Sequence, residues 1–405
     1  MRLAALAVAY GTQRFPEFWE YDIVARNLLA GRGLRYTWLG IDRQAYAEPI
    51  YPFVVAVVYR LTDFNVWALG IFHCAVSAVL APVTYMFASR TFGQRAGLAA
   101  GALIVIHPGL AGYAPKFHPL TFDALAIALV AFTLLRLLDT ADWPSTVLFG
   151  LATGLCVLAR PTILVFVAAV AVWLARYRWR RPVFRYFVFG LIVAAAVILP
   201  WVIRNYVAVG AVVLSRSHAG FNFWLGNHPG ATGGEGDPRD LSGSRSLFEA
   251  APADFRQRVL AERDEVAQNR VFVTEAIHYI TEKPLDFVAR TTMKFAYFWW
   301  FPPYFGKRYG TFEDAVYRAF YLGLVALAGA ALVRMYREPA LGHTDGVRLA
   351  ILLPVSMALA HALFVVQGRH RLAVETMLVV FSGHGVAWLA TCLAGRWSAW
   401  RGDVR

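Results

Sequence analysis

Three carboxylates, Glu17, Glu20 and Asp22, lie close together near the start of the chain, between two apolar stretches. The stretch predicts a short helix with its apolar residues on one face, ended by Gly31 and Gly33. A carboxylate held between membrane elements is desolvated, which raises its pKa and favours general-base chemistry. The alternative is a solvated helix face with capping carboxylates.

A second polar group is formed by Lys116 and His118, and Asp123 follows one turn into the next predicted helix. Lys and His both donate hydrogen bonds to phosphate oxygens, so this pair is a candidate phosphate contact. Asp123 is costly if it faces lipid, so we expect it to point into a polar cavity. Alternatively, Lys116 snorkels, His118 caps the helix, and Asp123 is a structural partner of one of them.

The elements that must position these side chains are membrane helices. The 405 residues are 58% hydrophobic and only 16% charged, and apolar runs of roughly 20 residues recur along the chain. We predict an all-α polytopic membrane protein with about ten transmembrane helices. The first, 1–10, is short for a bilayer, which we interpret as shortening by a misplaced start. The others are expected at 65–89, 96–112, 119–138, 144–159, 162–176, 184–203, 314–334, 348–367 and 372–395.

Basic residues are distributed unequally between the two faces of this predicted bundle. With the first helix starting in the cytoplasm, the inner loops contain 14 arginines and the short outer loops contain four basic residues. The formal net charge of +13 is therefore typical of cytoplasmic arginine on a membrane protein. The same assignment gathers the carboxylate stretch, Lys116 and Arg369 on the outer face.

Arginines at the outer ends of spans are a third candidate feature, at Arg204, Arg369 and Arg371. They can serve as membrane anchors, but the positive-inside rule disfavours them on this face. Clustered outer arginines indicate an anionic ligand, because arginine binds phosphate through two parallel hydrogen bonds.

The long polar segment 204–313 is predicted to lie on the outer face. It contains a Gly-rich and Asn-rich loop, a polar helix Asp254–Ile280 with Asp254 and Arg258 paired, and aromatic residues at 285–304 near the outer surface. We therefore divide the chain into an N-terminal transmembrane module, 1–203, whose first outer loop is 13–62, this segment, and C-terminal transmembrane helices at 314–405.

Several function classes find no support. The three cysteines lie in apolar runs, so neither a disulfide framework nor a thiolate metal site is expected. No Walker A, Rossmann or HExxH pattern occurs, and no zinc-finger spacing or separate basic domain suggests nucleic acid. An outer-face enzyme without nucleotide needs an activated donor, for which a lipid-linked phosphate ester would serve.

An ordered set of motifs resembles the bacterial glycosyltransferase family 39-like proteins of the C-type glycosyltransferase superfamily, with the dolichyl-phosphate-mannose–protein mannosyltransferases and the aminoarabinose transferase of lipid A. The motifs run over nearly the whole chain and comprise Glu17 with Tyr21 and Ala25-Arg26-Asn27, Glu48-Pro-Ile-Tyr-Pro52, Ala159-Arg160-Pro161-Thr162, Pro200-Trp-Val-Ile-Arg204-Asn205, Gly226-Asn227-His-Pro229, and Arg369-His-Arg371 with Glu375.

The resemblance implies a C-type fold with outer-face juxtamembrane helices, and transfer of a sugar from a polyprenyl-phosphate donor, with inversion, to a lipid, glycan or protein acceptor. The family's acidic residue in the first outer loop, usually Asp, falls on Glu17, which leaves Glu20 and Asp22 with helix-face roles. Asp123 is a second catalytic candidate. Donor-phosphate contacts are expected at Lys116, His118, Arg204, Arg369 and Arg371, and acceptor or positioning roles at Tyr21, Arg26, Glu48 and Asn227. Some superfamily members use a divalent metal, for which this chain shows no committed ligand set.

Two other function classes are compatible with the sequence. A transporter or flippase for a lipid-linked glycan would show paired half-helices or an inverted repeat with charges at mid-membrane, and neither is found. A non-catalytic scaffold of envelope assembly is the other class, and the sequence is compatible with it if Glu17 is not a base. The transferase hypothesis places the protein in a bacterial inner membrane with its site facing the periplasm.

Overall fold

The computed structural model describes residues 1–11, 20–179, 181–234, 244–301 and 311–402. Glu17, the residue to which the resemblance assigns the base, lies outside these ranges. Among the described residues, six helices are long and apolar enough to cross a membrane. They are α4 (Val66–Phe92), α7 (Leu120–Thr140), α10 (Pro182–Val209), α16 (Thr311–Arg337), α18 (Asp345–Leu363) and α20 (Glu375–Gly402).

Shorter helices complete the bundle, namely α1 (Arg2–Gly11), α3 (Ile50–Thr62), α5 (Gln94–Ile106), α6 (Pro108–Tyr113), α8 (Trp143–Ala159), α9 (Ile163–Arg178), α17 (Pro339–Gly342) and α19 (Gly368–Leu372). The predicted multi-pass, predominantly helical membrane fold is confirmed. The predicted number of about ten spans stays a prediction, because helices such as α5 and α8 are short for a bilayer.

Three predicted helix boundaries are wrong for identifiable reasons. The predicted span 96–112 is split at His107, which is extended because Pro108 follows it and disfavours helical backbone there. The predicted helix Asp254–Ile280 is two helices, because the Asp264 side chain accepts hydrogen bonds from two backbone N–H groups and starts a new helix. The span predicted at 184–203 continues to Val209 and ends at Gly210, whose φ is +69°.

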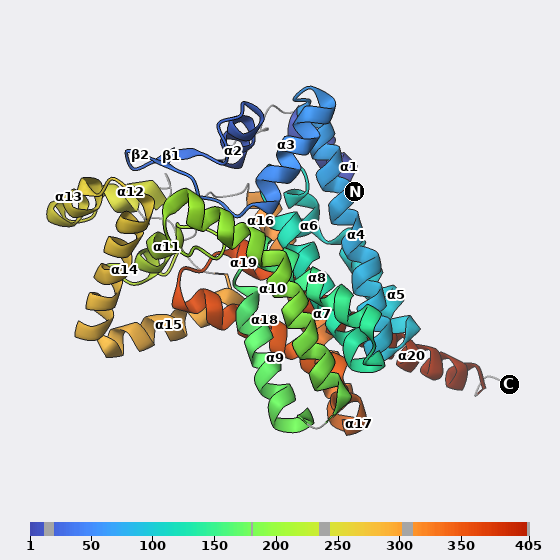
Figure 1. Ribbon diagram of the computed structural model, residues 1–405. Helices are drawn as coiled ribbons and strands as arrows, with labels where there is room; N and C mark the ends of the chain where they lie inside the picture. The colour runs from blue at the N-terminus through green and yellow to red at the C-terminus, as the bar shows by residue number, and fades with distance from the viewer. Residues whose placement is uncertain (12–19, 180, 235–243, 302–310, 403–405) are drawn as a thin grey trace.

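The remaining helices lie around one end of the bundle and to one side of it (Figure 1). They are α2 (Glu20–Leu29), α11 (Ala219–Gly226), α12 (Ser244–Glu249), α13 (Ala253–Ala261), α14 (Glu265–Glu282) and α15 (Pro284–Trp299). We call the end at which α2 and α11 lie the α2 end. The turn between α9 and α10, which carries exposed Arg181, and helix α17 lie at the opposite end (Figure 1).

A small antiparallel hairpin interrupts the all-α pattern between α2 and α3. Strands β1 (Tyr36–Trp38) and β2 (Ile41–Arg43) pair with Tyr36 opposite Arg43, and both turn residues, Leu39 and Gly40, have positive φ. Positive φ at both positions matches the tight turn that suits the twist of two strands. The Arg43 side chain is buried and donates to Gln268 on α14, so the hairpin is fixed to that helix.

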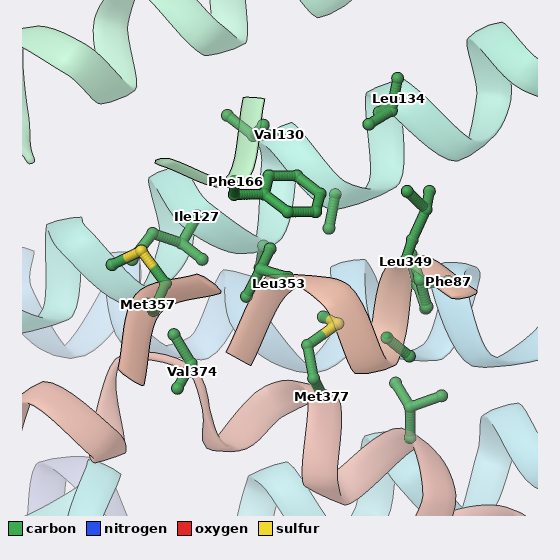
Figure 2. Packing of buried hydrophobic residues seen from close by; sticks show 14 of the residues in the cluster. Phe87, Ile127, Val130, Leu134, Phe166, Leu349, Leu353, Met357, Val374 and Met377 are labelled. Atoms are coloured by element: carbon green, nitrogen blue, oxygen red, sulfur yellow. The ribbon is translucent and has the colours of Figure 1, made fainter. Parts of the chain in front are cut away.

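The main hydrophobic core lies where α4, α7, α9, α18 and α20 meet. Figure 2 shows Phe87, Ile127, Phe166, Leu353 and Met377 packed together from these five helices, and all five are at most 1% exposed. Such a close-packed interior holds the helix ends in fixed positions. The side chains at the α2 end are therefore presented by a rigid frame.

Candidate functional site

The α2 end of the bundle brings together a buried group of charged and polar side chains. Asp123 in the first turn of α7 accepts a hydrogen bond from Arg160, the residue that ends α8, with Nη1 3.0 Å from Oδ2. Arg160 Nη2 also donates to Nε2 of His361 on α18 at 3.4 Å. The other Asp123 oxygen, Oδ1, is buried and has no hydrogen-bond partner among the described residues. Within the described part of the chain, Asp123 thus has one carboxylate oxygen anchored by Arg160 and one buried oxygen whose hydrogen-bonding capacity is unused.

A second ion pair lies within electrostatic reach of Asp123. Arg216, in the loop before α11, contacts Glu48 with Nε 3.1 Å from Oε1 and Nη1 3.5 Å from Oε2. This fork-like contact fixes both side chains. Tyr21 on α2 is buried next to this pair, and burial together with the Glu48 charge raises the pKa of its phenol well above 10. Tyr21 is therefore neutral.

Histidines and basic residues form the other side of the group. The rings of His361 and His370 stack with their centres 3.9 Å apart. Burial lowers the pKa of His118 well below 6.5, and the charges of Arg369, Arg160 and Lys116 lower it further. Burial also lowers the pKa of His370 well below 6.5, assisted by His361 and Arg160. Both histidines are therefore neutral at neutral pH, and the charges around them are cationic.

The loop that carries Lys116 and His118 is fixed from both ends. His118 Nδ1 accepts a hydrogen bond from the backbone N–H of Leu120, so His118 caps α7, which is the structural alternative predicted for it. His73 contacts the Lys116 carbonyl at 3.0 Å and the Tyr51 hydroxyl at 3.2 Å. The Lys116 ammonium lies 4.3 Å from the centre of the Tyr113 ring. The loop thus presents Lys116 and His118 in a set geometry.

We call this group the Asp123 cluster. It comprises Glu48, Lys116, His118, Asp123, Arg160, Arg216, His361, Arg369 and His370. A pocket of about 230 Å³ opens beside it, between the loop 211–214 and α14, and is lined by Arg216, Ser217 and Asn269. The ion-pair partner that the structure gives Asp123 is Arg160, at the end of α8.

Four predicted site residues lie elsewhere and have structural partners. Arg204 donates to the Gln44 carbonyl at 2.7 Å, behind the hairpin. Arg26 pairs with Asp22 at 2.9 Å on the same face of α2. The Asn227 side chain donates to the Phe223 and Leu363 carbonyls, both at 2.8 Å.

The fourth is Arg371, which faces away from the Asp123 cluster. Its Nε lies 2.8 Å from Glu375, its Nη1 donates to the Trp300 carbonyl and its Nη2 to the Tyr317 hydroxyl, both at 3.0 Å. His107 and Tyr317 contact the same Glu375 carboxylate. We call Arg371, Glu375, His107 and Tyr317 the Glu375 network. Since its arginine is already engaged, we leave Arg371 out of the donor contacts.

Asp22 also differs from its predicted role. It is 7% exposed rather than on a solvated helix face, and accepts hydrogen bonds from Arg26 and from the Tyr59 hydroxyl. This contact attaches α2 to α3. The predicted helix end is correct, since α2 stops at Leu29 and both Gly31 and Gly33 have positive φ.

A divalent metal finds no ligand set in the described part of the chain. No three His, Cys, Asp or Glu side chains come together there in a metal-binding geometry. Asp123 and Glu48 are each paired with an arginine, whose charge competes with a cation.

Sequence reasoning gave no site role to four members of the cluster, namely Arg160, Arg216, His361 and His370, although Arg160 lies in one of the family-like motifs. His361 had a usable signal, because a histidine inside an otherwise apolar helix needs a polar partner. His370 lies between the two arginines that were selected. Arg216 had no local signal, because its loop reaches Glu48 across 168 residues of chain.

Comparison with known proteins adds two findings to this geometry. Residues 47–203 match the family model described as dolichyl-phosphate-mannose-protein mannosyltransferase. The apo oligosaccharyltransferase of Archaeoglobus fulgidus superposes with a TM-score of 0.55 at 14% sequence identity, over 95% of this chain and 48% of that chain. This chain shares the fold of that oligosaccharyltransferase. The predicted resemblance is thereby confirmed, and the matched segment contains Glu48, Lys116, His118, Asp123 and Arg160.

Two further solved structures are similar to this chain. The Archaeoglobus fulgidus enzyme AglB in complex with an inhibitory peptide and a dolichol-phosphate also gives a TM-score of 0.55, at 16% identity, over 95% of this chain and 47% of that one. ArnT from Cupriavidus metallidurans bound to undecaprenyl phosphate gives 0.41 at 12% identity, over 92% and 73%. The chain spans about half the length of the archaeal enzyme. None of the curated proteins matches it.

Proposed function

We propose that this protein is a membrane glycosyltransferase that moves a sugar from a polyprenyl-phosphate donor to an acceptor hydroxyl, with inversion. The observation that carries the proposal is the open Oδ1 of Asp123, buried in a cluster whose other side is cationic. The family-model match, and the dolichol-phosphate in the complex of the archaeal relative, support a lipid-linked phosphate donor.

The cationic side of the cluster suits the phosphate of such a donor. Lys116 and Arg369 both lie within electrostatic reach of His118, and each of the three side chains can donate hydrogen bonds. Charge develops on the departing polyprenyl phosphate as the bond to the anomeric carbon breaks. Fixed donors at that position lower the barrier, because they stabilise the charge without reorganising.

The acidic side suits the acceptor. The acceptor oxygen attacks the anomeric carbon from the face opposite the phosphate, and its proton passes to a carboxylate. We assign that proton to Glu17, at the family's acidic position, and the orientation of the hydroxyl to Asp123 Oδ1. The pocket beside Arg216 and Ser217 is the proposed acceptor entrance.

The test is transfer from a radiolabelled polyprenyl-phosphate sugar by purified protein in the presence of membrane lipids. Glu17→Gln and Asp123→Asn are each expected to reduce transfer by at least about 100-fold, a typical loss for a proton-transferring or hydroxyl-orienting group. Arg258→Gln, at an exposed position of α13, is the control. Equal transfer by wild type and Glu17→Gln would exclude the base role, and no donor turnover with any acceptor would exclude the enzyme.

We further propose that the α2 end faces the periplasm of a bacterial inner membrane, because the arginine-rich turns lie at the other end. Exposed Thr37 on the hairpin and the free, exposed Cys392 near the C-terminus make this testable. A membrane-impermeant maleimide added to spheroplasts should label Thr37→Cys but not Cys392. Labelling of Cys392 alone would show that the α2 end faces the cytoplasm instead.

A further inference from the structure

A fully buried lysine, Lys294, lies on α15 and is not part of the Asp123 cluster. Its ammonium group donates to the Phe364 carbonyl at 2.9 Å, the Gly226 carbonyl at 3.1 Å and the Asn227 side-chain oxygen at 3.3 Å. In the described ranges no carboxylate pairs with it. Burial lowers its pKa to about 7, with a smaller contribution from the charge of Arg290. A buried charge without an anion is costly, so its contacts need an explanation.

The three oxygens that Lys294 contacts belong to two separate segments of chain. Gly226 and Asn227 follow α11, whereas Phe364 directly follows α18. The two segments also touch directly, because Val366 N–H donates to the Gly233 carbonyl at 2.9 Å. A Cβ at position 226 would lie 1.7 Å from the Phe364 carbonyl oxygen, so only glycine fits there. Lys294 therefore holds a tight junction between the α11 loop and the end of α18.

The segment that leaves this junction carries one side of the Asp123 cluster. His361 lies just before Phe364, and α19, with Arg369 and His370, lies just after it. Phe298, one turn beyond Lys294 on α15, stacks against His361 with ring centres 6.1 Å apart. Lys294 and Phe298 are the two buried residues of α15. The buried face of this helix is thus in contact with the segment that presents the histidine stack and Arg369.

We propose that Lys294 is a positioning residue of the transfer site. By binding the Phe364 carbonyl it fixes the connection between α18 and α19, and so the location of Arg369 and His370 at the donor phosphate. This inference rests on the proposed function for its effect on the reaction. Its structural part, the coupling of Lys294 to the α18–α19 connection, stands on the contacts alone.

Arg290 provides a matched control one turn earlier on the same helix. Its Nη1 donates to the carbonyls of His228 at 2.8 Å and Ala231 at 3.1 Å. It therefore binds the same α11 loop as Lys294 but makes no hydrogen bond to the α18–α19 connection. Loss of Arg290 loosens the loop, whereas loss of Lys294 loosens the loop and its link to α19.

The experiment compares Lys294→Met with Arg290→Met in the full chain. For Lys294→Met the KM for the polyprenyl-phosphate sugar should rise about tenfold with the acceptor KM unchanged, and for Arg290→Met both should stay within about twofold. An equal rise in both variants, or none in either, would overturn the positioning role.

Hydrogen exchange provides a second measurement that needs no activity. Amides of residues 365–372 should exchange faster in Lys294→Met than in Arg290→Met, whereas amides of the α11 loop should exchange faster in both. Unchanged exchange at 365–372 in Lys294→Met would overturn the inference. If wild type transfers no sugar, the proposed function fails and this exchange comparison still tests the coupling.

Discussion

The molecule contains two buried groups built from the same residue types, an arginine, a carboxylate and a histidine. In the Glu375 network, Oε1 accepts from Arg371 and Tyr317, and Oε2 is bonded to His107. In the Asp123 cluster, Oδ2 accepts from Arg160, and Oδ1 is without a partner among the described residues. A fully satisfied network rigidifies a fold, whereas a buried oxygen without a partner calls for an explanation, such as a catalytic role or a bound water or ion. Hydrogen-bond satisfaction of the carboxylate therefore distinguishes the structural Glu375 network from the candidate site at Asp123 better than residue type does.

The largest expected effect is on stability, from Glu375→Gln. The amide leaves the Arg371 guanidinium as an uncompensated buried charge, and breaking a buried pair in this way costs about 3–5 kcal/mol. Thermal unfolding in detergent measures the change. Glu338→Gln, which removes a half-exposed partner of Arg334, is the control. A wild-type unfolding midpoint for Glu375→Gln would show that the network is not a scaffold.

Asp123→Asn should have the opposite pattern of effects, with a large loss of transfer and a small loss of stability. Transfer should fall by at least about 100-fold, yet stability should change much less than in Glu375→Gln. The physical reason is that Arg160 keeps its contact to His361 and is partly exposed, so its charge is not stranded. Measuring initial transfer rates and unfolding midpoints on the same preparations separates the two effects. A large loss of stability with normal transfer would reverse the roles assigned to the two groups.

The third prediction concerns pH: acid should lower the stability of the folded protein because His118 and His370 of the Asp123 cluster are buried. Their pKa values are below 6.5 in the folded state, so at acidic pH the unfolded chain binds more protons than the folded chain. Stability is therefore full above about pH 6.5 and falls as pH decreases, by at most about 1.4 kcal/mol per pH unit for each histidine. Unfolding midpoints from pH 7.5 to 5 should slope less in the double variant His118→Gln/His370→Gln. Parallel slopes would contradict the assignment.

The smallest effect is expected at an exposed pair that resembles the buried ones only in composition. Arg258 is about half exposed and lies 2.8 Å from Glu275. Exposed ion pairs contribute about 0–1 kcal/mol, because water and salt screen them. Arg258→Gln should therefore shift the unfolding midpoint by a degree or two and leave transfer unchanged. A loss comparable to that of Glu375→Gln would mean that burial does not decide the strength of these contacts.

Local patterns in the sequence were sufficient for much of the architecture. Long apolar runs predict helices such as α7 and α10 because backbone groups in lipid must be satisfied within the helix. Gly31 and Gly33 mark the end of α2 because positive φ is easy for glycine. The interaction of Asp254 with Arg258 follows from helical spacing, and the structure has it at 4.0 Å. The split of 254–280 was missed, although Asp264 is a typical N-cap residue.

Composition and periodicity depend on neighbours along the chain, so they are enough to predict a helical membrane protein with acidic and basic residues near the ends of its helices. Which of those residues come together in a cluster depends instead on how the helices pack. Arg369 and Arg371 are two positions apart, and at about 100° per residue they leave α19 on nearly opposite sides. One therefore lies near His118 and the other binds Glu375. Arg216 and Lys294 likewise gain their partners from segments more than 60 residues away, a contact that no local pattern contains.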